Sequence, residues 1–207
     1  MRAYASQPEG AAKVPGVIVI LEAFGVKKHI QEVTAKLSRE GYVAVAPVLY
    51  HRLGSNPLFS YTGEDAEPRT KAMGSLKDTE LVQDLNATIA YLQGHAQVRA
   101  DRLGVVGFCV GGRILLPFGE GPTPFERTTD IQCPVMGNFG ELDQNPAPDE
   151  VRKIEAELRK RGNISDFKIY PGANHGFNCD ERPSYHAEAA KDAWARTLGW
   201  FQKYLQA

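Results

Sequence analysis

The segment Gly107-Phe-Cys109-Val-Gly111 is the part of the sequence whose residue types and spacing point most directly to chemistry. It has the form of a nucleophile elbow, G-x-S-x-G, with cysteine in the place of serine. Small residues two positions before and after the nucleophile allow such a turn to pack closely against its neighbours. The pattern is expected by chance only roughly 0.03 times in a chain of this composition. We therefore expect Cys109 to be a nucleophile rather than a small buried core residue.

A thiol nucleophile needs a base and a group that orients the base, and in hydrolases with this elbow the acid and then the histidine follow the nucleophile along the chain. His175 lies in a glycine-rich loop after an expected strand, and it is the candidate general base. Two carboxylates, Glu141 and Asp143, lie between the nucleophile and this histidine. Asp143 is preferred because the turn at Gly140 carries it further beyond the end of its strand.

A third carboxylate, Glu22, follows directly after the apolar run Gly16–Leu21. A side chain at this position points into the crevice beyond the strand end. The same turn is expected to supply one backbone N–H of an oxyanion hole, that of Ala23, and the residue after the nucleophile, Val110, is expected to supply the other.

The elements that must position these residues alternate along the chain between strands and helices. The expected strands are Gly16–Leu21, Tyr42–Ala46, Arg102–Phe108, Pro134–Phe139 and Asp166–Tyr170. The expected helices are Lys27–Glu40, Ser75–Gln93, Asp149–Arg161 and Ser184–Gln206, and Pro47–Met73 is expected to be a long loop. This alternation predicts one α/β domain over residues 1–207, with a mostly parallel sheet covered by helices on both faces. Ligands of such sheets bind beyond the carboxyl ends of the strands, where all the candidate residues lie.

Composition argues against several classes of partner. Lys and Arg total 24 and Asp and Glu total 25, so a formal net charge of -1 does not favour nucleic acid or an anionic membrane surface. The apolar runs are too short for a membrane span, and the N-terminus has no signal-peptide core. Three cysteines do not make a disulfide framework, which favours the reducing cytoplasm. Nucleotide-binding and metal-binding motifs are absent from the sequence, so we expect neither a cofactor nor a metal.

The sequence resembles the dienelactone hydrolase family, the carboxymethylenebutenolidase-like α/β-hydrolases, over nearly the whole chain. The segments that carry the resemblance are 17–25, 41–47, 49–52, 106–113, 140–143, 172–177 and 185–201. The resemblance implies a Cys109–His175–Asp143 triad and hydrolysis of a small-molecule enol-lactone or ester through a thioester acyl-enzyme. It also implies that Glu22 interacts with the resting thiol and helps to generate the thiolate. A monomer or a weak homo-oligomer is expected.

The sequence departs from the family pattern at positions that concern the substrate. Family members bind the dienelactone carboxylate with an arginine four residues after the catalytic histidine, but that position is Cys179 here, and Arg182 lies three residues further on. The family has a second carboxylate-binding arginine in the long loop-to-helix region, and Arg69 is the nearest candidate here. The family pattern Ala-Pro-Asp-Leu-Tyr has Val48 in the place of its aspartate. These changes bear on the substrate more than on the reaction.

The segment after the elbow is shorter than the family pattern. Cys133 lies only 21 positions after Gly112, and Pro117 should end the helix that follows the elbow. Most of that helix and the next strand are therefore expected to be missing. We expect either a rearranged short strand within Ile114–Phe118 that fills the gap, or a protein that keeps the fold and hydrolyses poorly.

Two other functional readings stay open. A catalytically impaired paralogue would use the same cleft to bind small molecules or partners, and the shortened segment favours it. A Cys-elbow amidotransferase or glyoxalase-like protein also pairs the elbow cysteine with a strand-end glutamate. Such proteins commonly place histidine directly after the cysteine, but here that residue is Val110.

Overall fold

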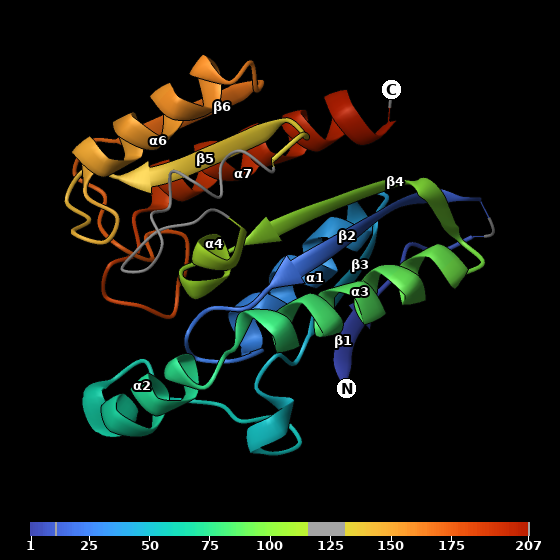
Figure 1. Cartoon of the computed structure of the whole chain (residues 1–207), viewed down its shortest axis with the longest axis horizontal. Helices are drawn as coiled ribbons and strands as arrows, with labels where there is room; N and C mark the ends of the chain where they lie inside the picture. The colour runs from blue at the N-terminus through green and yellow to red at the C-terminus, as the bar shows by residue number, and fades with distance from the viewer. Residues whose placement is uncertain (11, 116–130, 207) are drawn as a thin grey trace. The chain divides into compact units, whose positions relative to one another are not determined.

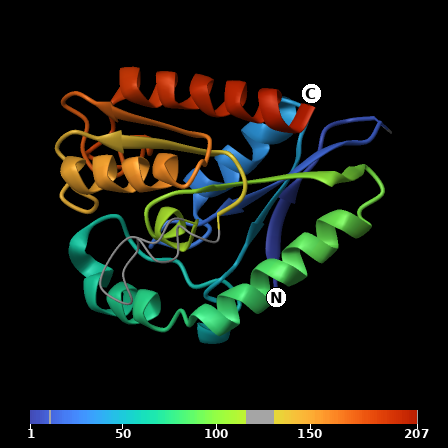
Figure 2. The same ribbon diagram turned by 45° about the horizontal axis from the view of Figure 1, so that its top comes forward.

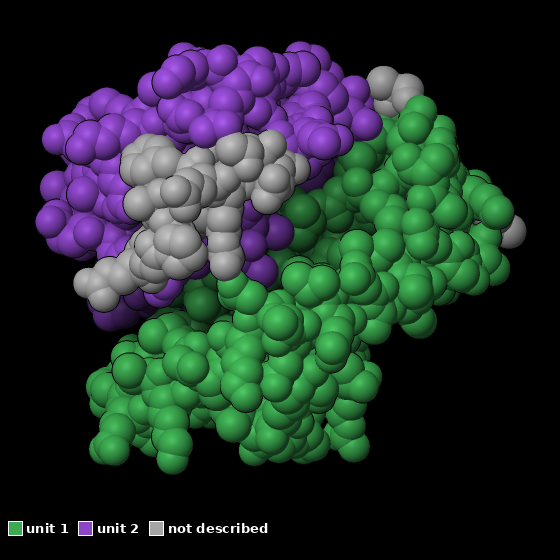
Figure 3. Space-filling view, in the orientation of Figure 1, with its two compact units in different colours: residues 1–112, 205–207 green, residues 113–204 purple. Residues whose placement is uncertain are grey.

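The computed structural model describes residues 1–10, 12–115 and 131–206, and these divide into two compact units. Unit 1 contains residues 1–112 and 205–207, and unit 2 contains residues 113–204 (Figure 3). Each unit has its own sheet, with four strands in unit 1 and two strands in unit 2 among the described residues. No helix in this described part of the chain has both the length and the apolar character needed to cross a membrane.

The sheet of unit 1 has the strand order β1-β3-β2-β4. Its strands are β1 (Ala3–Ser6), β2 (Val14–Ile20), β3 (Val43–Pro47) and β4 (Val98–Gly107). β2, β3 and β4 are parallel to one another, whereas β1 pairs with β3 in the antiparallel direction. The β-branched run of β2 is buried from Pro15 to Ile20, as expected for a strand covered on both faces. The carboxyl ends of β2, β3 and β4 therefore meet at one edge of this sheet (Figure 1).

Two long helices cover the faces of this sheet. α1 (Lys28–Arg39) lies on one face and α3 (Asp78–Gly94) on the other, as both ribbon views show (Figures 1 and 2). The predicted apolar stripe of α1 is confirmed, because Ile30, Val33 and Leu37 are all almost fully buried. Gly41 ends the helix with φ +87°, a conformation that glycine adopts without the steric cost of a Cβ.

The segment after β3 differs from the sequence prediction of a continuous long loop. It contains the short 3-10 turns η1 (His51–Leu53) and η2 (Gly63–Asp65), and the helix α2 (Ala66–Gly74). Pro68 lies in the first turn of α2, where its missing N–H leaves no intrahelical hydrogen bond unmade. The proline that suggested a loop is thus compatible with the start of a helix.

A charged cluster joins this segment to α3. The Asp84 carboxylate is buried and accepts two hydrogen bonds from the Arg52 guanidinium, at 2.6 and 3.1 Å. His51 Nε2 lies 3.2 Å from both carboxylate oxygens. Although burial alone would raise the pKa of Asp84, these partners outweigh it and hold the pKa below its ordinary value. The cluster fixes the start of the segment that follows β3.

We predict that Asp84→Asn lowers the free energy of unfolding by about 2 kcal/mol at neutral pH, because it removes the charge that satisfies Arg52 and His51. The folded pKa of Asp84 lies below its unfolded value, so this difference is fully present above the unfolded pKa. It should disappear as the pH falls through the folded pKa. Denaturant unfolding at several pH values measures the effect.

The control for this prediction is Glu32→Gln on α1. Glu32 makes an exposed ion pair with Lys28 at 3.6 Å, and such pairs contribute little to stability. If Asp84→Asn lowers the free energy of unfolding no more than Glu32→Gln does, the stabilising role of the cluster is contradicted.

Unit 2 is built on two parallel strands, β5 (Val135–Gly140) and β6 (Ser165–Tyr170). The helices α6 (Pro148–Lys160) and α7 (Ala187–Phe201) flank this pair of strands (Figure 2), and the π-helical turn η4 (Gln202–Gln206) follows α7. Ile154 and Leu158 of α6 pack onto partly buried aromatic residues of both strands. Because β5 and β6 are parallel, the loops after them leave the sheet at the same edge.

The helix after the elbow, α4, is described over Val110–Leu115. The expectation of a short strand within Ile114–Phe118 is wrong for Ile114 and Leu115, which are helical, because the chain continues directly from the elbow turn into a helix. Residues 116–118 lie outside the described part of the chain, as does the rest of the segment up to residue 130.

Candidate active site

Cys109 lies on a strained turn between β4 and α4. Its φ of +56° makes it the one described residue other than glycine with a positive φ. The left-handed region is costly for a residue with a Cβ, and such strain concentrates at functional sites. The turn is held by two backbone hydrogen bonds, from Phe108 N–H to the Ile20 carbonyl and from Gly111 N–H to the Phe108 carbonyl. This is the backbone conformation that a nucleophile elbow requires.

Gly111 explains why the elbow needs a small residue two positions after the cysteine. A Cβ at this position would lie 2.8 Å from the carbonyl oxygens of both Ile20 and Leu21. Those oxygens belong to the backbone at the end of β2, so they are not free to move aside. The elbow thus packs directly against the strand end that precedes Glu22.

The turn after β2 brings Glu22 and Ala23 to the same sheet edge as Cys109. Glu22 is 2% exposed, so its carboxylate is buried rather than solvated. The Tyr61 hydroxyl donates a hydrogen bond to Glu22 Oε2 at 3.3 Å. The turn itself is closed by Gly25 N–H, which donates to the Glu22 carbonyl at 3.1 Å. A buried acid at the same sheet edge as an elbow cysteine is suited to influence the protonation of the thiol.

The two expected oxyanion donors are both at this edge of unit 1. Val110 is the first residue of α4, and the first N–H groups of a helix have no intrahelical acceptor. Among the residues that the structure describes, no hydrogen bond of the Ala23 N–H is found. Both residues are buried, with exposed fractions of 8% and 5%. Their N–H groups are therefore suited to receive a negatively charged oxygen.

Arg69 belongs to an aromatic and cationic group near Glu22. Its guanidinium lies 4.9 Å from the centre of the Phe24 ring, and the Phe24 and Tyr61 rings are 4.6 Å apart. Lys27 Nζ lies 4.0 Å from the centre of the Tyr61 ring. The sequence pattern predicts a site role for Arg69 but for neither Lys27 nor Tyr61. Lys27 lies two residues after the Glu22–Gly25 turn, but the position of Tyr61 depends on the course of the segment after β3.

In unit 2, His175 and Asp143 form a hydrogen-bonded pair. His175 Nδ1 lies 2.8 Å from Asp143 Oδ2, and Asp143 is 7% exposed. The other carboxylate oxygen accepts a hydrogen bond from Asn145 N–H at 2.8 Å. Burial alone would raise the pKa of Asp143, but these hydrogen bonds outweigh burial and hold the pKa below its ordinary value. The carboxylate is thus ionised and oriented toward the imidazole at neutral pH.

Glu141, the competing acid, has a different position. It is exposed, and its Oε2 accepts a hydrogen bond from Gly172 N–H at 2.9 Å. Gly140, just before it, approaches the His175 loop closely, since a Cβ there would lie 2.6 Å from the Ala173 carbonyl oxygen. Glu141 therefore connects the loop after β5 to the loop after β6. Asp143 is the carboxylate that contacts His175.

Cys179 and Arg182 follow His175 in the same loop region. Cys179, at the position where the family has an arginine, is completely buried. Arg182 is partly buried, and its guanidinium fills the space that a Cβ at Gly176 would need. Of the predicted site residues, Cys109 and Glu22 lie in unit 1, whereas His175 and Asp143 lie in unit 2.

Comparison with known proteins assigns the chain to a family. The model of the dienelactone hydrolase family matches residues 1–120 and 117–205. A Synechocystis protein provisionally named a carboxymethylenebutenolidase is 37% identical over 98% of this chain and 92% of its own length. A Bradyrhizobium protein, provisionally named a 2-oxo-3-(5-oxofuran-2-ylidene)propanoate lactonase, is 29% identical over 98% of this chain and 89% of its own.

A solved structure shows the same relationship. The crystal structure of a provisionally named dienelactone hydrolase from Klebsiella pneumoniae matches with a TM-score of 0.86 and 32% identity. The match covers 98% of this chain and 92% of the other.

The comparisons also bear on the shortened segment. The Synechocystis alignment spans 225 positions against 207 residues in this chain, which leaves at least 18 positions where only the relative has a residue. The two family matches meet at residues 117–120, within the segment predicted to be shortened. With the elbow turn and the full-length matches in agreement, the chain belongs to the dienelactone hydrolase family of α/β-hydrolases and is a carboxylic ester hydrolase.

Proposed function

We propose that the chain hydrolyses an enol-lactone or an activated ester through a Cys109–His175–Asp143 triad. Residues 1–207 then act as one domain. The observation that carries the proposal is the left-handed backbone of Cys109 in an elbow packed against the end of β2. The hydrogen bond between His175 and the ionised, buried Asp143 supports it from the other unit.

In this mechanism His175 accepts the proton of the Cys109 thiol and becomes an imidazolium, and the thiolate attacks the carbonyl carbon of the substrate. The tetrahedral oxyanion is stabilised by the N–H groups of Ala23 and Val110. The carbon–oxygen bond then breaks, and the enolate or alkoxide leaves with a proton from the His175 imidazolium. Water, deprotonated by the neutral imidazole, hydrolyses the thioester to a carboxylate and returns the thiol. Asp143 keeps the imidazole oriented in both steps.

Glu22 has the role of tuning the thiol in this proposal. Its carboxylate is buried and held by Tyr61, so it does not drift into solvent. In the resting enzyme the carboxylate interacts with the Cys109 thiol, and when substrate arrives it helps to remove the thiol proton. This role requires a reduced cysteine, and the cytoplasm is the compartment that we propose.

The substrate class follows from the cationic groups available. With Cys179 in the place of a carboxylate-binding arginine, the remaining candidates are Arg69 and Arg182. We predict that an anionic dienelactone loses most of the advantage that its carboxylate normally provides. The loss of one charge-assisted partner corresponds to roughly 1.5–3 kcal/mol, or 10- to 150-fold in kcat/KM. Neutral butenolides and activated esters should therefore compete well.

Steady-state kinetics with matched anionic and neutral butenolides measure this preference. Arg69→Met is the informative variant, because methionine keeps a long apolar side chain over the Phe24 ring while it removes the charge. A kcat/KM for the anionic lactone far above that for the neutral one, reduced selectively by Arg69→Met, would show that Arg69 replaces the missing arginine.

A second candidate function is supported by the shortened segment. In this alternative, a family member that lacks at least 18 residues of its relative keeps the fold and binds small molecules in the same cleft without efficient turnover. Hydrolysis of p-nitrophenyl acetate separates the two candidates, because it requires the nucleophile and the oxyanion hole but no carboxylate recognition. A rate equal to that of buffer alone would favour the binding protein.

A further inference from the structure

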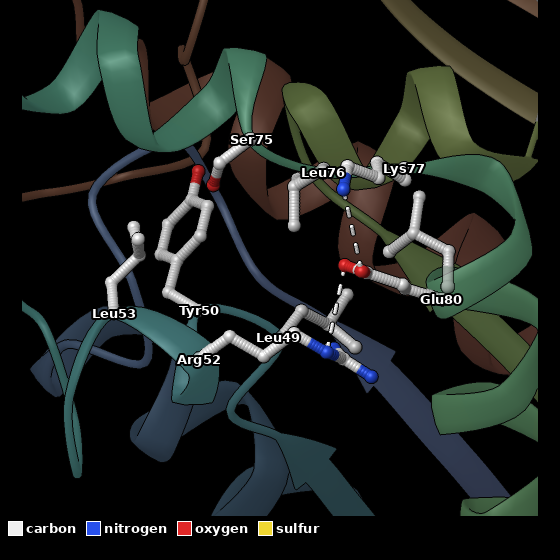
Figure 4. Close-up of a pocket in the computed structure, with 9 residues that line it drawn as sticks. Leu49, Tyr50, Arg52, Leu53, Ser75, Leu76, Lys77 and Glu80 are labelled. Atoms are coloured by element: carbon white, nitrogen blue, oxygen red, sulfur yellow. Dashed lines mark ion pairs between the residues drawn. The ribbon is translucent and has the colours of Figure 1, made fainter.

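Tyr50 is a buried residue at the same sheet edge as the candidate nucleophile. It follows the end of β3 and is 1% exposed. Its ring packs edge-on against Phe59, with ring centres 5.9 Å apart and an interplanar angle of 76°. Together with Leu53 and Leu76 it also lines a small cavity of about 10 Å³, beside the Arg52–Glu80 ion pair (Figure 4). The ring is therefore held in place by packing on several sides.

The Tyr50 hydroxyl donates a hydrogen bond to the carbonyl oxygen of Ala23 at 3.3 Å. It thereby reaches the turn that supplies one of the proposed oxyanion donors. The peptide group before Ala23 is held separately, because the Glu22 carbonyl accepts the hydrogen bond of Gly25 N–H. In a trans peptide the C=O and N–H point in opposite directions, so fixing the Glu22 carbonyl also fixes the direction of the Ala23 N–H.

The peptide group after Ala23 is restrained by Tyr50, because the Tyr50 hydroxyl holds the Ala23 carbonyl. The next carbonyl, that of Phe24, accepts a hydrogen bond from Phe59 N–H at 3.1 Å. Three successive carbonyl groups of the turn are thus held, and Tyr50 supplies the one hydrogen bond of the three that comes from a side chain. Ala23 is fixed on both sides.

The electrostatic environment keeps the Tyr50 hydroxyl protonated. Burial is the largest cause that raises the pKa of Tyr50, and the negative charge of a Cys109 thiolate raises it further. The Arg69 guanidinium lowers it by a smaller amount. The effect of Cys109 also shows that the phenol lies within electrostatic range of the nucleophile. The hydroxyl therefore stays a donor while the thiolate is present.

We propose that Tyr50 is a positioning residue for the oxyanion hole: its buried hydroxyl holds the peptide group after Ala23 and, together with the Gly25 hydrogen bond that holds the peptide group before it, keeps Ala23 in place so that its N–H meets the oxyanion that forms beside Cys109. This inference rests on the proposed function, since it assumes that Cys109 forms a tetrahedral adduct. In this inference Tyr50, which is outside the triad, stabilises the transition state and does not contribute to substrate binding.

Tyr50→Phe tests the proposal because it removes the hydroxyl and keeps the ring. With p-nitrophenyl acetate, kcat should fall by about 10- to 100-fold, somewhat less than for the removal of an oxyanion donor itself. KM should change by less than about twofold. A trifluoromethyl ketone, which forms a tetrahedral adduct with the thiolate, should bind more weakly by the same factor as kcat falls. The pH profile of Cys109 alkylation by iodoacetamide should not change.

Tyr170→Phe is the matched control. Tyr170 is also a buried phenol, but its hydroxyl donates to Asp192 Oδ2 at 2.7 Å in unit 2. We expect a similar decrease of a few degrees in Tm in both variants, and unchanged kcat and ketone affinity in the control. Equal losses of kcat in both variants would show a general structural effect and overturn the proposal.

The wild-type enzyme separates the failure of this inference from the failure of the proposed function. If wild type does not hydrolyse the ester through Cys109, the proposed function fails before Tyr50 is tested. If wild type hydrolyses it through Cys109 while Tyr50→Phe keeps full kcat and full ketone affinity, the proposed function stands and the role of Tyr50 is refuted. Ketone binding gives this answer even where turnover is slow.

Discussion

Replacing Cys109 with alanine is expected to reduce hydrolysis of p-nitrophenyl acetate and of butenolides to the rate of buffer alone, a loss of at least about 10³-fold. The reason is that no other described residue occupies a nucleophile elbow. Alanine fits the turn as well as cysteine does, so the fold should persist and a Tm close to that of wild type is expected. Stopped-flow kinetics should show a burst of p-nitrophenol in wild type and none in the variant.

The other two cysteines provide the controls. Cys133 is exposed and Cys179 is buried, and neither follows a strand as part of an elbow. Cys133→Ala should keep full activity, and Cys179→Ala should keep most of it with a lower Tm, because it leaves a small cavity. Iodoacetamide labelling is best read in the Cys133→Ala background, where Cys109 should be the thiol that reacts. Chelators should have no effect. Full activity in Cys109→Ala would refute the mechanism.

Asp143→Asn is expected to lower kcat by about 10⁴-fold, as in other triads whose orienting acid is converted to an amide. The Asp143 carboxylate accepts the Nδ1–H of His175 at 2.8 Å, which leaves Nε2 of the ring available as the base. An asparagine would favour a different imidazole orientation or tautomer. Steady-state kinetics over a pH series measure the loss, and KM should change little.

Glu141→Gln is the matched control, because Glu141 lies two residues away in the same loop. Its exposed carboxylate accepts one backbone hydrogen bond from Gly172, which a glutamine oxygen can also accept. We expect less than about a fivefold change in kcat. A larger decrease in kcat for Glu141→Gln than for Asp143→Asn would show that Glu141 is the functional acid.

The pKa of Asp143 also gives the sign of a pH effect on stability. Because the folded pKa lies below the ordinary value, the His175 pair stabilises the fold at all pH values above the unfolded pKa. This contribution should be lost as the pH falls through the folded pKa. Wild type and Asp143→Asn should therefore converge in Tm at acid pH.

Much of the fold could be predicted from local patterns. The continuous β-branched run of β2 and the apolar spacing of α1 predict their burial, and both predictions are confirmed. The edge strand β1 and the helix α2 were missed, for different reasons. β1 has only four residues and is a strand because β3 offers it a partner, whereas Pro68 obscured the start of α2.

The candidate site was predictable to a smaller extent. The elbow motif identifies Cys109, and strand-end positions identify Glu22, Asp143 and His175 as candidates, although their catalytic roles stay predictions. Burial distinguishes Asp143 from Glu141 only in the folded chain, since the two acids are nearly equivalent in the sequence. The contribution of Tyr61 to the Glu22 site has no local signal at all.

By itself, the sequence determined which residue types follow each strand and that the chain is an α/β-hydrolase of this family. Only the tertiary structure decided that Cys109 has a left-handed backbone, that Glu22 is buried and that the Tyr50 hydroxyl reaches Ala23. The physical reason is that strand and helix periodicity are properties of neighbouring residues. The order β1-β3-β2-β4, by contrast, comes from hydrogen bonds between segments far apart in the chain, and it decides which strand ends meet.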